Sequence, residues 1–226
     1  MAFTTRHNGA SAEPYGSANV SFDVGDDPDH VEANRASLKN RFRLKALVDC
    51  TQVHGDEVRL DAVPGMECEA DGLTTSLPRL GLMIKTADCQ PLLLAHESGK
   101  YVAALHVGWR GNRIGFPISG VQRFCEAYGI KPEELFAVRG PSLGPDHAEF
   151  VNFESDFGPD FAPWFRPETQ TMDLWALTRH QLMQAGLQEG RIRSLDLCTF
   201  TQESDFFSYR RDKLTGRQAG IIWIQS

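Results

Sequence analysis

Three short stretches of the sequence carry imidazole or thiol side chains beside glycine or at the ends of expected strands. They are residues 52–55 with His54, residues 86–89 with Cys89, and residues 106–111 with His106. Loops held by a rigid scaffold are where binding and catalytic residues concentrate. Thiolate and imidazole together suit a zinc ion, with copper less favoured in a reducing compartment, or a cysteine nucleophile beside its base.

The spacing of Cys89 and His106 predicts that their side chains meet. If the strands on either side of residues 97–99 form a hairpin, the numbers of paired residues add up to about 195 to 197, and those of Cys89 and His106 add up to 195. Directly paired residues place their Cβ atoms roughly 5 Å apart. His54 would complete a set of three ligands and leave the fourth tetrahedral position of a zinc ion open, as in catalytic sites.

Other interpretations of these three residues stay open. In one, they are a strand-end cysteine and two hydrogen-bonded histidines that bind nothing. In a second, Cys89 is the nucleophile of a hydrolase or deamidase and His106 is its base. In a third, the chain is a partner protein that binds a metal ion without turnover. His54 separates the zinc enzyme from the cysteine hydrolase, because a Cys–His pair needs no second imidazole beside the sulfur.

Three further charged residues lie where they could serve the same site. Asp88 precedes Cys89 and is the nearest carboxylate in sequence, so it could be a catalytic proton shuttle or cap a turn. Arg110 precedes the helix expected over residues 114–128, whose N-terminal amides favour an anion. We expect Arg110 and Arg210 to bind substrate or phosphate, because the planar guanidinium suits bidentate contacts with phosphate. The alternative for each arginine is a structural ion pair or an exposed charge.

The elements that must position these residues form a mixed pattern. Helices are expected over residues 29–42, 114–128 and 173–185, and strands over residues 44–49, 80–85, 91–95, 101–106, 136–139, 192–197 and 219–224. Residues 15–22 are expected to form a turn that leads into a strand. The absence of a regular βαβ alternation favours a mixed α/β or α+β fold over a doubly wound sheet. Neither GxGxxG after a strand nor GxxxxGK[ST] is present, so a nucleotide cofactor bound by either motif is unsupported.

Composition limits the classes of protein to which the chain can belong. With 226 residues and no repeat or linker, residues 1–226 are expected to form a single domain. A net charge of −7 argues against a nucleic-acid-binding protein. No apolar run approaches the roughly 18 residues of a membrane span, and no signal peptide is evident, so we expect a cytoplasmic protein without membrane contact. The 5 cysteines include no CxxC pair and are expected to be free thiols or ligands.

The order and spacing of the three stretches resemble the YfiH family, whose members have been called polyphenol oxidases or laccase-domain proteins. The resemblance spans almost the whole chain as one YfiH-like, laccase-type domain. It includes residues 15–19, 24–27 and 32–35 near the start, residues 70–73 and 139–144 in the middle, and residues 198–199, 207–212 and 215–217 near the end. Motifs this numerous and collinear are specific to one family.

The resemblance implies a fold, a site and an activity. The fold would be a mixed β-sheet core flanked by helices, similar to the cysteine deamidase domain of cytotoxic necrotizing factors. The family's zinc-binding and catalytic residues fall on His54, Cys89 and His106. The implied activity is zinc-dependent phosphorolysis of adenosine, inosine, guanosine and methylthioadenosine with phosphate as co-substrate, together with deamination of adenosine, in a monomer or small homo-oligomer. A copper-dependent polyphenol oxidase is a weaker alternative, because one three-ligand site lacks the histidine pairs of a multicopper cluster.

Two features of the chain bear on this implied site. Where relatives often have a cysteine-containing segment after the Gly-Pro loop, this chain has His147. The imidazole of His147 could add a ligand, support the site or lie at the surface. A purine base is expected to stack on an aromatic ring, and the candidates are Phe206, Phe207 and Tyr209.

Overall fold

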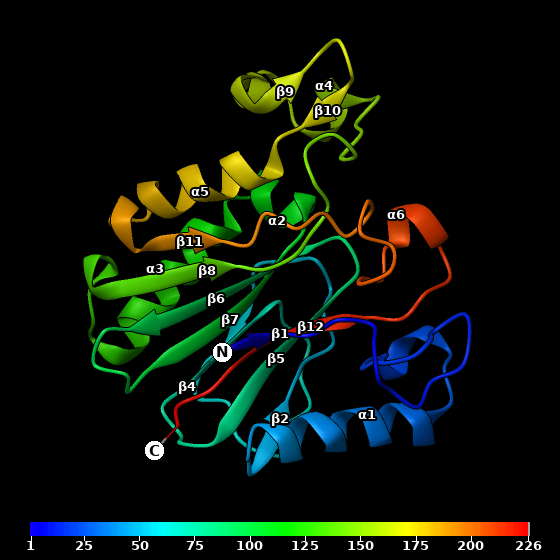
Figure 1. Cartoon of the computed structure of the whole chain (residues 1–226). Coiled ribbons are helices and arrows are strands. Elements are labelled where there is room, and N and C mark those ends of the chain that lie inside the picture. The colour runs from blue at the N-terminus through cyan, green and yellow to red at the C-terminus, as the bar shows by residue number, and fades with distance from the viewer. Residues whose placement is uncertain (226) are drawn as a thin grey trace.

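The computed structural model describes residues 1–225 and arranges most of its strands in two sheets (Figure 1). The smaller sheet contains β1 (Ala2–Phe3), β2 (Ala46–Val48), β5 (Leu80–Thr86) and β12 (Gln218–Ile222). The larger contains β3 (Val58–Arg59), β4 (Gly72–Thr75), β6 (Gln90–His96), β7 (Val102–Val107), β8 (Leu135–Arg139) and β11 (Ile192–Ser194). Their orders are β1-β12-β5-β2 and β11-β8-β6-β7-β4-β3. Each sheet mixes parallel and antiparallel neighbours.

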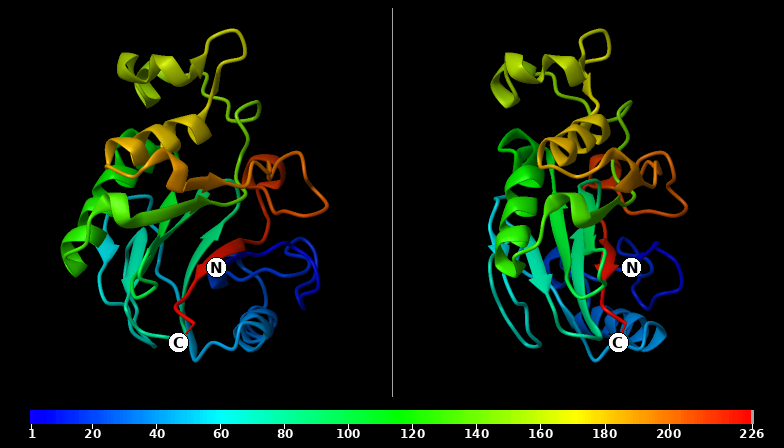
Figure 2. Two further views of the ribbon diagram at one scale, coloured as in Figure 1. Left: turned by 60° about the vertical axis from the view of Figure 1, so that its left-hand side comes forward. Right: turned by 90° about the vertical axis from the view of Figure 1, so that its left-hand side faces the viewer.

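Helices cover the outer faces of both sheets, as the views of Figure 2 show. Helix α1 (Pro28–Arg41) lies beside the smaller sheet, and α3 (Phe116–Tyr128) and α5 (Leu174–Gln184) cover the larger one. Three short helices are α2 (Trp109–Arg113), α4 (Phe153–Asp156) and α6 (Tyr209–Asp212). The predicted mixed fold with helices flanking a sheet core is confirmed, with two packed sheets in place of one.

Strand β5 illustrates how the layers form. Successive side chains of a strand point to opposite faces. Leu82 and Ile84 accordingly pack in the apolar cluster between the two sheets, whereas Met83 packs in the cluster that includes Leu38 of α1. Because both faces of the strand are buried, its sequence is a nearly continuous apolar run.

The helix predicted over residues 114–128 begins later than expected. Its first residue is Phe116, after Gly115, which has a left-handed φ of 74°. Residues 109–113 form the separate helix α2, so Arg110 lies inside that short helix and does not stand at the start of α3. Ile114, the first residue of the expected helix, is exposed between the two helices.

The strand predicted within residues 15–22 does not form. Side chains take up the hydrogen-bonding groups that a sheet ladder would use. Asn34 of α1 donates to the carbonyls of Ser17 and Asn19, and Arg35 donates to the carbonyl of Val20. The segment is therefore fixed to α1 as an irregular loop.

An aromatic lobe stands beyond α5, at the top of Figure 1. It contains α4 and the strand pair β9 (Phe165–Arg166) and β10 (Thr171–Met172). Phe153 stacks on Phe165 with 4.1 Å between the ring centroids. None of the helices within residues 1–225 is long and apolar enough to cross a membrane.

Candidate functional site

Three separate elements bring His54, Cys89 and His106 together where β5 and β7 end. His54 lies in the loop after β2, Cys89 in the connection from β5 to β6, and His106 on β7. Their ligand atoms all lie within 4.8 Å of one another, and Cys89 Sγ is 4.0 Å from His54 Nε2. The structure thus assembles the three residues that sequence spacing had grouped.

The register of the β6–β7 hairpin lies at the upper end of the expected range. Pro91 pairs with His106 and Gln90 with Val107, so the numbers of paired residues add up to 197. Cys89 is therefore a diagonal rather than a direct neighbour of His106, and that part of the prediction was wrong. Residues two apart along a strand face the same side, so the side chains of Cys89 and His106 still lie close together.

Asp71 holds both histidines, although the sequence analysis gave it no role. Its carboxylate is fully buried and accepts a hydrogen bond of 2.7 Å from His106 Nδ1. It also accepts from three consecutive backbone N–H groups, those of Val53, His54 and Gly55. Because an ionised carboxylate can only accept, Nδ1 must carry a proton, so Nε2 is the nitrogen of His106 that can bind a metal, once that nitrogen is deprotonated. No spacing in the sequence relates Asp71 to His106, since their contact depends on the pairing of β4 with β7.

The loop that carries His54 is held in an unusual conformation. His54 has a left-handed φ of 61°, which non-glycine residues rarely adopt. The preceding Gln52 side chain accepts from the N–H of Lys85 and donates to its carbonyl, both at 2.8 Å. These bonds tie the loop to β5, while Asp71 ties it to the larger sheet.

Charges within the group favour a thiolate at Cys89. Burial opposes ionisation of the thiol, but the charge of His106 and hydrogen bonds from both histidines outweigh it and lower the pKa of Cys89 to about 6. Burial also disfavours a charge on His106, yet the Cys89 thiolate and Asp71 raise the pKa of that imidazole to about 9. Asp71 has a pKa below its usual value, because His106 and backbone N–H groups offset the cost of burial. The thiolate is the form that binds metals or attacks as a nucleophile.

The donor set fits a small tetrahedral ion. Ligands of a tetrahedral zinc ion lie about 3.3–3.6 Å apart at ordinary Zn–S and Zn–N bond lengths. The observed separations, up to 4.8 Å, are close enough for small side-chain adjustments to reach these values. Gly108 keeps the space beside them open, because a Cβ atom there would lie 3.0 Å from Cys89 Sγ and 3.3 Å from His54 Cδ2.

Asp88 is placed beside the three donors but its carboxylate is engaged elsewhere. It accepts a 2.7 Å bond from Thr199 Oγ1 and a 2.6 Å bond from the backbone N–H of Arg210. Its own backbone has a φ of 100° and its carbonyl accepts from Leu143 N–H. Asp88 therefore ties three distant segments to the connection that carries Cys89.

The two arginines proposed for substrate binding differ in their surroundings. Arg110 is exposed, and its guanidinium lies 4.5 Å from the ring centroid of Trp109. Arg210 is half-buried, and its guanidinium donates to the carbonyl of Glu149 at 3.2 and 3.3 Å. Neither has an ion-pair partner within the part of the chain that the structure describes.

The remaining candidates separate into core and surface residues. Phe206 and Phe207 are buried, whereas Tyr209 is 53% exposed. His147 stacks on Phe200 with 4.4 Å between ring centroids and is not among the three converging donors.

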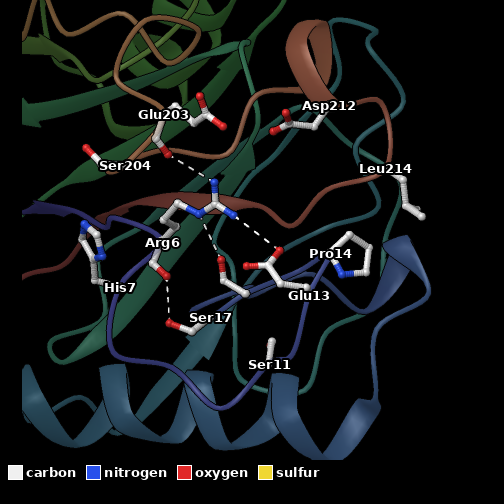
Figure 3. A pocket seen from close by; sticks show the side chains of 11 residues that line it. Arg6, His7, Ser11, Glu13, Pro14, Ser17, Glu203, Ser204, Asp212 and Leu214 are labelled. Carbon is white, nitrogen blue, oxygen red and sulfur yellow. Dashed lines mark hydrogen bonds and ion pairs between the residues drawn. The ribbon is translucent and has the colours of Figure 1, made fainter.

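A cavity of about 830 Å³ lies between the N-terminal loop and the segment after residue 202 (Figure 3). It includes none of the three donors. Arg6 crosses it, donating to the carbonyls of Gly16 and Glu203 at 3.0 and 3.2 Å. Arg6 therefore links the two chain segments that line this cavity.

Comparison with known proteins extends over nearly the whole chain. The family model described as multi-copper polyphenol oxidoreductase laccase matches residues 1–225. Purine nucleoside phosphorylase YfiH of Escherichia coli is 36% identical over 98% of this chain and 92% of its own length. A purine nucleoside phosphorylase of Pseudomonas aeruginosa is 34% identical with the same coverage.

Solved structures agree with the sequence comparison. A protein of Neisseria meningitidis has a TM-score of 0.88 at 32% identity, over 99% of this chain and 93% of that chain. YlmD from Geobacillus stearothermophilus has a TM-score of 0.88 at 30% identity, over 99% and 91%. With its sheets, its three converging donors and these matches, the chain belongs to the multi-copper polyphenol oxidoreductase laccase family that includes the YfiH proteins.

Proposed function

We propose that this protein is a purine nucleoside phosphorylase that uses the group of His54, Cys89 and His106. The observation that carries the proposal is the 36% identity to the Escherichia coli purine nucleoside phosphorylase over 98% of the chain. The converging donors support it, because they form one group of imidazole and thiol ligands at the end of both sheets.

Zinc is the metal that we propose for the three donors. One thiolate and two imidazoles suit zinc, and His106 already has the carboxylate partner that metal-bound histidines commonly use. When bound, zinc supplies Lewis-acid chemistry that activates water at neutral pH. Asp71 would hold the proton on His106 Nδ1, and the loop of residues 53–55 would aim His54.

The proposed substrates are adenosine, inosine, guanosine and methylthioadenosine, each cleaved with inorganic phosphate, and adenosine for deamination. Arg110 and Arg210 are proposed to contact substrate from α2 and α6. The exposed Tyr209 ring is proposed to stack on the purine. For Asp88 the engaged carboxylate favours positioning of Cys89 and Arg210 over proton transfer. We propose a cytoplasmic enzyme, acting as a monomer or small homo-oligomer.

A cysteine hydrolase is the second candidate, and one observation favours it. Asp71, His106 and Cys89 form a chain in which the carboxylate orients the imidazole and the imidazole lowers the pKa of the thiol to about 6. This is the logic of a nucleophile, base and orienting acid. Polyphenol oxidation is less favoured, because residues 1–225 hold one such three-donor group, fewer than a multicopper cluster needs.

Product analysis separates these functions. Purified protein of known metal content is incubated with adenosine, with and without phosphate. Adenine and ribose 1-phosphate, formed only when phosphate is present, support phosphorolysis, and inosine supports deamination. Full activity of metal-free protein would contradict the zinc role and favour Cys89 as the nucleophile.

A further inference from the structure

Two arginines near Cys89 differ from the other arginines of the chain. Among residues 1–225, an arginine that has no carboxylate within ion-pair distance is generally exposed. Arg210 and Arg217 are the exceptions, since both are half-buried without such a partner. The Arg210 guanidinium is occupied by the carbonyl of Glu149. Arg217 has no carboxylate partner either, and its guanidinium is bonded through one terminal nitrogen only.

Arg217 lies directly before β12 and next to the connection that carries Cys89. In the antiparallel pairing of β12 with β5, Gln218 pairs with Thr86, which places Arg217 beside the start of that connection. The negative charges of Cys89 and Asp88 act on its guanidinium, while burial lowers its pKa. One guanidinium nitrogen donates to the carbonyls of Thr215 and Gly216 at 2.9 and 3.0 Å. The other N–H groups have no acceptor in the described part of the chain.

One buried polar atom without a hydrogen-bond partner belongs to a residue that Arg217 contacts. Within residues 1–225, the buried side-chain atoms that form no hydrogen bond in the protein are Thr86 Oγ1, Gln90 Oε1 and Thr215 Oγ1. Thr86 and Gln90 flank Cys89 in sequence, and the Thr215 carbonyl accepts from Arg217. An unsatisfied buried hydroxyl costs free energy, so native proteins rarely keep one without a use. The Thr215 hydroxyl, which belongs to the residue whose carbonyl accepts from Arg217, therefore indicates a place for a polar ligand.

We propose that Arg217 and the Thr215 hydroxyl bind the inorganic phosphate that attacks the nucleoside. A guanidinium with free N–H groups and a hydroxyl without an acceptor are donors that match phosphate oxygens. The inference rests on the proposed phosphorylase function. In the reaction, a phosphate oxygen bonds to C1′ of the ribose as the C1′–N9 bond breaks. The bond's electron pair leaves with N9, and the phosphate proton passes to the purine.

This assignment differs from the one based on sequence, which gave phosphate binding to Arg110 and Arg210. Arg110 is exposed on Trp109, and Arg210 uses both terminal nitrogens on the carbonyl of Glu149. Arg217 uses only one terminal nitrogen on backbone carbonyls, so it has the stronger claim to a buried anion. A phosphoryl group could also belong to a nucleoside 5′-monophosphate. The proposal commits to free phosphate, and the experiment includes adenosine 5′-monophosphate to separate the two.

The variants are Arg217→Lys, Arg217→Ala and Thr215→Val, with Arg41→Ala on the far end of α1 as the matched control. For Arg217→Lys and Thr215→Val we expect the KM for phosphate to rise about tenfold or more, with the KM for nucleoside and the metal content unchanged. Thr215→Val discriminates sharply: a purely structural hydroxyl without a partner predicts equal or higher thermal stability and no change in phosphate KM.

Calorimetric titration of each variant with inorganic phosphate alone separates this inference from the proposed function. If wild type binds phosphate, and Arg217→Ala loses that binding while its melting temperature shows a folded protein, the site stands even should nucleoside turnover fail. If Arg217→Ala is unfolded, the phosphate affinities of Arg217→Lys and Thr215→Val test the proposal instead. Unchanged phosphate binding in these variants, or binding of adenosine 5′-monophosphate but not phosphate, overturns the proposal.

Discussion

Asp71, which is fully buried, and Asp88, which is half-buried, both support the group around Cys89, and they hold their surroundings by different means. Asp71 accepts from three backbone N–H groups and from the His106 imidazole, so its charge acts directly on a donor of the site. Asp88 accepts from the Thr199 hydroxyl and the Arg210 backbone N–H, which are both neutral donors. Asp71 therefore controls the protonation of the donors, whereas Asp88 controls the positions of the segments that carry Thr199 and Arg210.

The largest effect is expected from removing the Cys89 thiolate itself. Cys89→Ser should abolish metal binding and nucleoside turnover, because a neutral hydroxyl does not replace the charge of a thiolate ligand. Cys125→Ser is the control, since Cys125 packs in the core cluster under α3. Elemental analysis beside product assays measures both. Retained metal and activity in Cys89→Ser would remove the site from consideration.

The two aspartates should then differ in which property they change. Asp71→Asn should weaken metal binding about 10- to 100-fold, because the amide no longer fixes the His106 proton or its charge. Asp88→Asn should leave metal affinity nearly unchanged and raise the KM for nucleoside. Competition with a chelator gives the metal affinity of each variant. An equal loss of metal affinity in the two variants would contradict the different roles assigned to Asp71 and Asp88.

The pH dependence of thiol reactivity sharpens the same comparison. As pH rises through about 6, Cys89 should convert to thiolate in metal-free protein, because His106 and His54 lower its pKa against the effect of burial. An ordinary cysteine would ionise near about 8.5. Alkylation by iodoacetamide, mapped to Cys89 by mass spectrometry, follows the change. Asp71→Asn should move the midpoint upward, and Asp88→Asn should move it less.

The smallest effect is expected at Gly108. Gly108→Ala adds a Cβ 3.0 Å from Cys89 Sγ, a separation that forces a shift of a few tenths of an ångström. We expect a several-fold loss of metal affinity with little change in melting temperature. An unchanged affinity would mean that the donors move more freely than their hydrogen bonds suggest.

The sequence predicted the three donors and most of the central strands, and particular residues explain where it failed. The apolar runs at β5, β6 and β7 are long and bounded by polar turns, so their boundaries were nearly correct. The strand within residues 15–22 failed because Asn34 and Arg35, on α1, take its carbonyls. Such contacts between distant residues leave no local pattern.

The same limit applies to the site. His54, Cys89 and His106 could be grouped because their residue types are unusual and lie at strand ends. Asp71 could not be recognised as their partner, because its contact with His106 follows from strand pairing alone. Arg110 was predicted to precede a helix that begins at residue 114. The helix α3 begins at Phe116 instead, because Gly115 separates it from α2.

The three donors come from both sheets, and this has a consequence for the thermal behaviour of the protein. His54 and Cys89 follow strands of the smaller sheet, whereas His106 belongs to the larger one. An ion bound by all three donors would link the two sheets at one end, and it would bind only the folded chain. Such binding adds about 2.7 kcal/mol of stability when free metal is at 100 times its dissociation constant. The melting temperature would then rise with the concentration of free metal. The amide hydrogens at that end of β5 and β7 would exchange most slowly when the metal is bound.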